Sequence, residues 1–166
     1  MMKKLIIFDR DNTLIEDKGH THKIENLKFL PKNIKTLSYV SKKKYLIAVI
    51  TNQGGVAKGL YNISQVHRFH KKIKTILKKK NINLIFFFCP HHPKGEVPKY
   101  SIKCKCRKPG DLLIKKALLK TSTAKKNCIM FGDKFTDKQA ALKAKIRFYY
   151  RQKKFFSQVK KIIDKG

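Results

Sequence analysis

Carboxylates follow two short apolar runs at spacings that could hold a phosphate group and a metal ion. Asp9 and Asp11 come directly after one run, and Asp133 and Asp137 come after another, in a chain with only ten Asp and Glu residues. Carboxylate oxygens are the ligands that a hard cation such as Mg²⁺ prefers, and a carboxylate can also act as a nucleophile or an acid–base group. We therefore expect a magnesium site, although the first pair could form an Asx-rich turn and Asp137 could cap a helix.

A second polar segment follows another apolar run and reads Thr51-Asn52-Gln53-Gly54-Gly55. A hydroxyl, two side-chain amides and an unhindered backbone can bind phosphate oxygens without adding negative charge. An ordinary strand-to-helix turn would have a similar composition. The segment is therefore a candidate phosphate site mainly because of its position in the predicted fold.

Three of the four cysteines gather with two histidines in residues 89–106, which we call the zinc loop. In a small protein this clustering indicates a metal site more than disulfides. Three thiolates and one imidazole form a closed tetrahedral structural zinc site, for which we expect these ligands: Cys89, His91, Cys104 and Cys106. His92 could compete with its neighbour, and a group of thiols without metal is the alternative. Cys128 lies apart and is expected to be an inert buried thiol.

The elements that must position these groups alternate along the chain. Five apolar runs are typical of strands buried on both faces of a parallel sheet: 4–8, 46–50, 84–88, 127–131 and 146–150. Helical patterns lie between and after them, the second with Ser64 as its expected N-cap: 32–43, 64–80, 111–120, 135–145 and 155–164. This alternation predicts a single doubly wound α/β domain over 1–166, with a mainly parallel sheet and no large cap domain. Ligands then bind beyond the carboxyl ends of the strands, where all of the motifs fall.

The net charge of +31 is the strongest compositional feature. Of the 41 basic residues, 36 are Lys and five are Arg, spread along the whole chain. A dedicated nucleic-acid surface would use more Arg, and Lys and Ile are residues of A/T-rich codons, so we interpret the charge as compositional bias. A basic, zinc-containing nucleic-acid-binding protein is the alternative from another class. No apolar run reaches the roughly 20 residues of a membrane span, and no signal-peptide pattern is present, so we expect a cytoplasmic monomer without membrane or specific nucleic-acid partners.

Taken in order, these motifs resemble the four motifs of the haloacid-dehalogenase superfamily over residues 8–137, with Lys108 in Arg107-Lys108-Pro109 as the third. The resemblance implies a phosphatase in which Asp9 is the nucleophile and Asp11 is the general acid and base. It also implies that Thr51 and Lys108 stabilise the transferred phosphoryl group. The implied Mg²⁺ ligands are Asp9, Asp11 through its main-chain carbonyl, and Asp133, with Asp137 in support.

The zinc loop resembles that of small phosphatases acting on D-glycero-D-manno-heptose 1,7-bisphosphate or histidinol phosphate. Twelve residues separate His91 from Cys104, which is similar to the heptose enzymes. This implies Mg²⁺-dependent removal of the 7-phosphate, in ADP-heptose and lipopolysaccharide core biosynthesis, with histidinol phosphate as the alternative substrate. Asn12, His20 and Gly54 depart from the usual Gly, Tyr and Ser. The residues that the resemblance assigns to substrate binding are Thr13, Asp17, His20, Asn52, Gln53, Arg107 and Lys134.

Overall fold

The computed structural model describes residues 2–165 and contains a five-stranded parallel sheet. Its strands are β1 (Leu5–Phe8), β2 (Leu46–Asn52), β3 (Ile85–Cys89), β4 (Cys128–Gly132) and β5 (Arg147–Tyr150). They lie in the order β3-β2-β1-β4-β5, so the first strand occupies the centre of the sheet. The chain changes direction across the sheet between β3 and β4. The adjacent carboxyl ends of β1 and β4 therefore form a topological switch point, where α/β proteins bind ligands.

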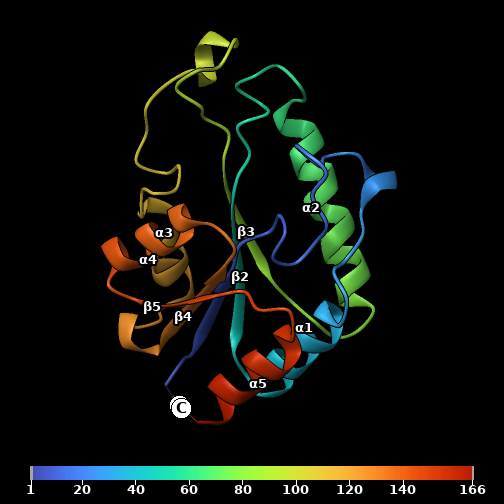
Figure 1. The fold of residues 1–166 in the computed structure, drawn as a ribbon, viewed down its shortest axis with the longest axis vertical. Helices are drawn as coiled ribbons and strands as arrows, with labels where there is room; N and C mark the ends of the chain where they lie inside the picture. Colours follow the sequence, from blue (N-terminus) through green and yellow to red (C-terminus); the bar gives the residue numbers. More distant parts are fainter. Residues whose placement is uncertain (1, 166) are drawn as a thin grey trace.

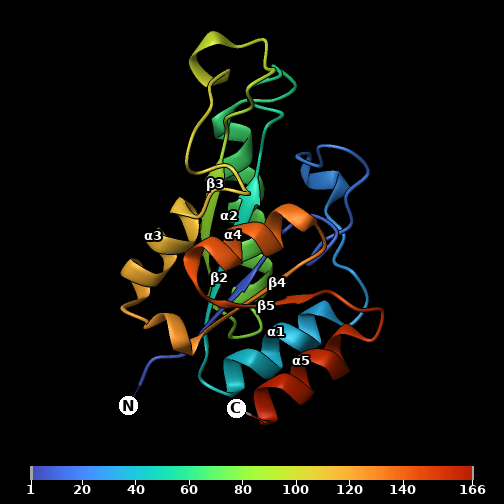
Figure 2. The same ribbon diagram turned by 60° about the vertical axis from the view of Figure 1, so that its left-hand side comes forward.

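Five α-helices cover the two faces of this sheet (Figures 1 and 2). They are α1 (Asn33–Lys42), α2 (Ile63–Lys78), α3 (Leu112–Thr121), α4 (Phe135–Ala144) and α5 (Phe155–Asp164). Three short 3₁₀ helices accompany them: η1 (Ile24–Asn26), η2 (Pro98–Tyr100) and η3 (Lys125–Asn127). None of the described helices is long and apolar enough to cross a membrane.

The sheet is apolar on both faces because alternate strand residues point into two separate cores. Ile6 and Phe8 of β1 face the core formed with α1, α2 and α5. Leu5 and Ile7 face the core formed with α3 and α4. All four side chains are completely buried. This arrangement confirms the predicted doubly wound α/β class and explains why the strands appear as continuous apolar runs.

The predicted elements agree with the structure to within two residues at each boundary, but one predicted cap is wrong. The N-cap of α2 is Asn62 and not Ser64, which lies in the first turn. The Asn62 side chain accepts a hydrogen bond from Gln65 N, and the Gln65 side chain accepts one from Asn62 N, both at 2.9 Å. This reciprocal capping box satisfies two main-chain donors, which a cap at Ser64 would leave exposed.

The zinc loop forms a long excursion above the carboxyl end of the sheet, beside the segment that follows β2 (Figures 1 and 2). Main-chain hydrogen bonds join these two segments. The Ala57 carbonyl accepts from Glu96 N at 2.7 Å and from Val97 N at 2.9 Å. The segment after β2 and the zinc loop are thus tied together on the same side of the site.

Candidate active site

Asp9 lies at the centre of the sheet and is paired with a buried lysine. The Lys108 ammonium lies 2.5 Å from Asp9 Oδ1 and 2.6 Å from Asp137 Oδ1, and all three side chains are at least 95% buried. Burial raises the pKa of Asp9 to about 8, although Lys108 favours its carboxylate form. Burial also disfavours the Lys108 ammonium, but Asp9 and Asp137 outweigh this effect and raise its pKa. The nucleophile predicted from the sequence therefore depends on neighbouring positive charge for its ionisation.

The carboxylates of Asp9, Asp133 and Asp137 form an oxygen cluster, with one oxygen of each within 4.8 Å of the others. Both Asp137 oxygens already have partners, because one pairs with Lys108 and the other accepts from Lys134 N at 3.0 Å. Asp137 is thus suited to support the site, while Asp9 and Asp133 have oxygens available for a cation. An all-oxygen donor set fits Mg²⁺.

Asp11 turns its side chain away from this cluster into a cradle of donors. Thr51 Oγ1 donates to Asp11 Oδ2 at 3.1 Å, and Gln53 Nε2 donates to the same oxygen at 3.0 Å. Arg10 binds the other oxygen, Oδ1, at 2.8 Å. The Tyr61 hydroxyl donates to Gln53 Oε1 at 2.8 Å and so fixes which end of the amide faces Asp11. The carboxylate is therefore held at a defined position beside the nucleophile.

Asn52 and Arg107 join the segment after β2 to the end of the zinc loop. Asn52 donates to the Lys108 carbonyl and accepts from Lys108 N, both at 3.0 Å, so its amide clamps the main chain that carries the buried lysine. Arg107 donates to the His91 carbonyl at 3.1 Å. The position of both cations thus depends on the path of the zinc loop.

A cavity of about 550 Å³ opens above these groups and is called the catalytic cavity below. Of the predicted site residues, the following line it: Asp9, Asp11, Asp17, His20, Asn52, Gln53, Arg107, Lys108 and Lys134. Thr13 was predicted to bind substrate, but its buried hydroxyl instead lies 3.5 Å from Asp133 Oδ1, outside the cavity lining. Sequence reasoning did not select several lining residues: Arg10, Lys58, Tyr61 and His92. Lys58 lies three residues beyond the candidate phosphate segment 51–55, and this proximity is a signal that could have selected it.

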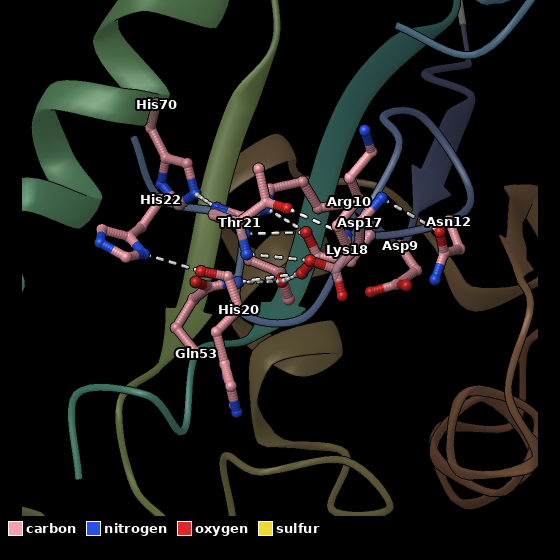
Figure 3. Close-up of polar contacts among 12 residues, drawn as sticks. Asp9, Arg10, Asn12, Asp17, Lys18, His20, Thr21, His22, Gln53 and His70 are labelled. Carbon is pink, nitrogen blue, oxygen red and sulfur yellow. Dashed lines mark hydrogen bonds and ion pairs between the residues drawn. The ribbon is translucent and has the colours of Figure 1, made fainter. Parts of the chain in front are cut away.

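Asn12 occupies a position where the related phosphatases usually have Gly, and its backbone conformation explains why Asn can replace Gly there. Its φ angle is +56°, a left-handed conformation that Gly and Asn adopt more readily than other residues. The side chain also gains a partner, because Asn12 Oδ1 accepts from Asp17 N at 3.1 Å. This bond connects the first catalytic turn to the loop carrying Asp17 and His20 (Figure 3).

We expect Asn12→Ala to lower the free energy of unfolding by about 1–2 kcal/mol, because a β-carbon without a local polar partner is strained at this φ angle. Asn12→Gly, the matched control, should lose less than half of that. Urea denaturation of both variants measures the difference. Equal stability of the Ala variant and the wild-type protein would show that the left-handed turn carries no strain.

The four predicted zinc ligands converge in the structure. Sulfur–sulfur distances among Cys89, Cys104 and Cys106 are 3.0–3.5 Å, and His91 Nδ1 lies 3.3 Å from Cys106 Sγ. All three cysteines are free, and these distances greatly exceed a disulfide bond of about 2.05 Å. They are close to ligand separations around a tetrahedral zinc. His92 does not compete, because its Nδ1 accepts from Lys94 N at 3.1 Å and its ring lines the catalytic cavity.

Comparison with known proteins gives consistent results. A family model described as Polynucleotide kinase 3 phosphatase matches residues 4–161. D-glycero-beta-D-manno-heptose-1,7-bisphosphate 7-phosphatase of Haemophilus influenzae is 33% identical over 88% of this chain and 79% of its own length. The corresponding alpha-heptose phosphatase of Photorhabdus laumondii is 36% identical over 86% of this chain and 79% of its own.

The fold also matches a solved structure closely. D,D-heptose 1,7-bisphosphate phosphatase from B. bronchiseptica, complexed with magnesium and phosphate, superimposes with a TM-score of 0.81. The match covers 98% of this chain and 99% of that chain at 20% identity. The family model, the sequence relatives and the fold agree across almost the whole chain. The chain belongs to the polynucleotide kinase 3 phosphatase family of haloacid-dehalogenase-like phosphatases, and within it to the heptose-1,7-bisphosphate 7-phosphatases.

Proposed function

We propose that this protein removes the 7-phosphate of D-glycero-D-manno-heptose 1,7-bisphosphate in a Mg²⁺-dependent reaction. The observation that carries the proposal is the buried pairing of Asp9 with Lys108 at the base of a cavity that Arg107, Lys58 and Lys134 also line. One phosphate can approach Asp9, while the remaining cations can neutralise the second. A bisphosphate uses both charged regions, whereas a monophosphate uses one. The product, a heptose 1-phosphate, would serve ADP-heptose synthesis.

The proposed chemistry proceeds in two steps on this chain's own residues. Asp9 attacks phosphorus and forms an aspartyl-phosphate while the bond to the sugar oxygen breaks and Asp11 supplies that oxygen with a proton. Asp11 then accepts a proton from water, whose oxygen attacks phosphorus and releases phosphate and free Asp9. Lys108 stabilises the charge on the transferred group, whereas Thr51, to which the resemblance gives the same role, is fully buried and donates to Asp11 Oδ2. A Mg²⁺ ion bound by Asp9, the Asp11 carbonyl and Asp133 would neutralise phosphate charge and favour the ionised nucleophile.

Zinc would have a structural role in this scheme. Its ligands begin at Cys89, at the end of β3, and finish at Cys106, immediately before Arg107 and Lys108. A closed four-ligand site leaves no position for substrate, so its effect is to fix the main chain that carries the two cations. We also propose, as the sequence analysis expects, that the protein acts as a monomer in the cytoplasm.

The test compares Mg²⁺-dependent phosphate release from both anomers of heptose 1,7-bisphosphate, histidinol phosphate and a 3′-phosphorylated oligonucleotide. We expect the highest kcat/KM on a heptose bisphosphate. Preference for histidinol phosphate would keep the mechanism and change the substrate. Preference for the oligonucleotide would give the large positive charge a function in binding nucleic acid. No activity on any of the four by folded, metal-loaded protein would refute the proposal.

Gly54, which replaces the usual Ser, provides a test of the second phosphate site. A β-carbon at this position would lie 2.9 Å from Arg107 Nη1 and 3.2 Å from His92 Cδ2, so the glycine lets Arg107 pack against the segment after β2. We expect Gly54→Ser to displace the guanidinium and raise KM for the bisphosphate about 3- to 10-fold, the loss of part of a charge-assisted contact. Steady-state kinetics should show an unchanged KM for a sugar monophosphate. Equal increases in KM for both substrates would show that Arg107 does not bind the second phosphate.

A further inference from the structure

Arg10 is a buried cation next to the proposed acid–base group, and its contacts require explanation. Its side chain is 1% exposed, and its guanidinium lies over the Phe69 ring at 4.9 Å. It binds Asp11 Oδ1 and donates to the Thr21 carbonyl, both at 2.8 Å. A buried guanidinium is costly unless its N–H groups have acceptors. Asp11 is the one carboxylate with which the described structure pairs it, so the remaining N–H groups depend on neutral acceptors.

His70 of α2 supplies the neutral acceptor on the far side of Arg10 (Figure 3). Its Nε2 lies 3.2 Å from Arg10 Nη1, and its ring stacks on Phe86 of β3 at 4.0 Å with an interplanar angle of 6°. A guanidinium can only donate, so Nε2 must carry a lone pair and any ring proton must lie on Nδ1. Burial and the Arg10 charge lower the pKa of His70 to about 2, so the imidazole is neutral at physiological pH.

The two Asp11 oxygens are thus held by two separate chains of hydrogen bonds. Oδ2 is bound by Thr51 and by Gln53, whose orientation Tyr61 fixes. Oδ1 is bound by Arg10, whose orientation is fixed by His70 and the Thr21 carbonyl. Phe69 and His70 are adjacent residues of α2, so this helix supplies both the ring face under the guanidinium and the acceptor at its edge.

We propose that His70 is a positioning residue for catalysis, whose Nε2 lone pair orients Arg10 and thereby places the Asp11 carboxyl for proton transfer. This inference rests on the acid–base role proposed for Asp11. His70 itself does not line the catalytic cavity, so it acts through Arg10. An anionic acceptor at position 70 would compete with Asp11 for the guanidinium, and a protonated imidazole would repel it. A neutral imidazole held in one tautomer avoids both effects.

The experiment compares two substitutions at position 70 in the full chain loaded with both metals. His70→Phe keeps a flat ring that can stack on Phe86 but has no acceptor, whereas His70→Gln can place Oε1 near the position of Nε2. We expect the Phe variant to lower kcat for the preferred substrate by about 10- to 100-fold, the loss of a hydrogen bond to a charged group, with KM within about twofold. The Gln variant should recover most of kcat. His67→Phe is the matched control, because His67 is exposed one turn earlier and stacks edge-on against Phe88.

A spectroscopic measurement tests the same geometry without any substrate. The ¹⁵N shifts of the His70 ring, assigned by their absence in His70→Gln, should report a neutral ring protonated on Nδ1 from about pH 5 to about pH 8. A proton on Nε2, or a titration in this interval, would overturn the proposal even if the Phe variant failed to fold. Full kcat in folded His70→Phe, or equal losses in the Phe and Gln variants, would also overturn it.

Failure of the substrate assignment can be separated from failure of this inference. If the wild-type protein does not hydrolyse heptose bisphosphate, kcat of the three variants is compared on p-nitrophenyl phosphate. If p-nitrophenyl phosphate is not hydrolysed either, the ¹⁵N shifts of the His70 ring alone establish the tautomer and the contact with Arg10 on which the inference depends.

Discussion

Asp9→Asn should abolish phosphatase activity while leaving the fold intact. The substitution keeps the size and shape of the side chain but removes the anionic oxygen that attacks phosphorus. We expect kcat to fall by at least about 10⁴-fold, as in other enzymes that lose their nucleophile. Lys108 retains Asp137 as an ionic partner at 2.6 Å, so the buried ammonium is not left alone. Phosphate release and circular dichroism measured on the same preparation check both parts of this expectation.

The control for this variant is Asp111→Asn, which changes a carboxylate paired with Lys115 on α3 and outside the catalytic cavity. It should retain wild-type kcat. With radiolabelled bisphosphate and rapid acid quench, label should appear on the peptide containing Asp9 in the wild-type protein and not in Asp9→Asn. Activity of the Asn variant above about a tenth of wild type would be incompatible with a covalent role for Asp9.

Cys104→Ser should remove zinc and impair the catalytic cavity together. The substitution replaces one of the four converging ligands with an alcohol that binds zinc poorly. Loss of the metal releases the main chain leading to Arg107 and Lys108, so we expect kcat/KM to fall about 10- to 100-fold. Elemental analysis gives the zinc content, and thermal unfolding should shift to lower temperature because metal binding contributes to folding.

Cys128→Ala distinguishes the loss of zinc from the loss of any thiol. Cys128 is buried in β4 and lies outside the group of converging ligands. Its Ala variant should keep its zinc and lose about 1 kcal/mol of stability from the cavity that the smaller side chain leaves. If Cys104→Ser retained full zinc content and unchanged kinetics, the assignment of the zinc loop would be wrong.

The sheet and its helices could be predicted closely because the three central strands, β1, β2 and β4, are buried on both faces. The run Leu5 to Phe8 is apolar at every position, and the parallel pairing of β1 with both β2 and β4 explains why. The convergence of Asp9 and Asp133 also follows from topology, since β1 and β4 are neighbours whose carboxyl ends coincide. These predictions need only local patterns and the geometry of parallel strands.

Side-chain contacts between segments far apart in the sequence could not be predicted in this way. In the sequence His70 is one polar residue among several in the predicted helix 64–80, and nothing local indicates that its ring contacts Arg10, sixty positions earlier. Thr13 was assigned to substrate because of its place in a motif, but the turn buries its hydroxyl beside Asp133. Side-chain direction within a turn depends on the surrounding packing, which spacing alone does not encode.

The guanidinium contacts described above give the unusual composition a further meaning. Lys outnumbers Arg by 36 to five in this chain, so Lys carries most of its positive charge. Three of the five arginines nevertheless bind main-chain carbonyls around the site: Arg10 at Thr21, Arg107 at His91, and Arg151 at Thr13. A planar guanidinium holds its five N–H donors in a fixed fork, whereas the three donors of an ammonium rotate about one bond. At these three positions the fixed direction of the N–H donors, and not charge alone, therefore holds main-chain segments around the site in place.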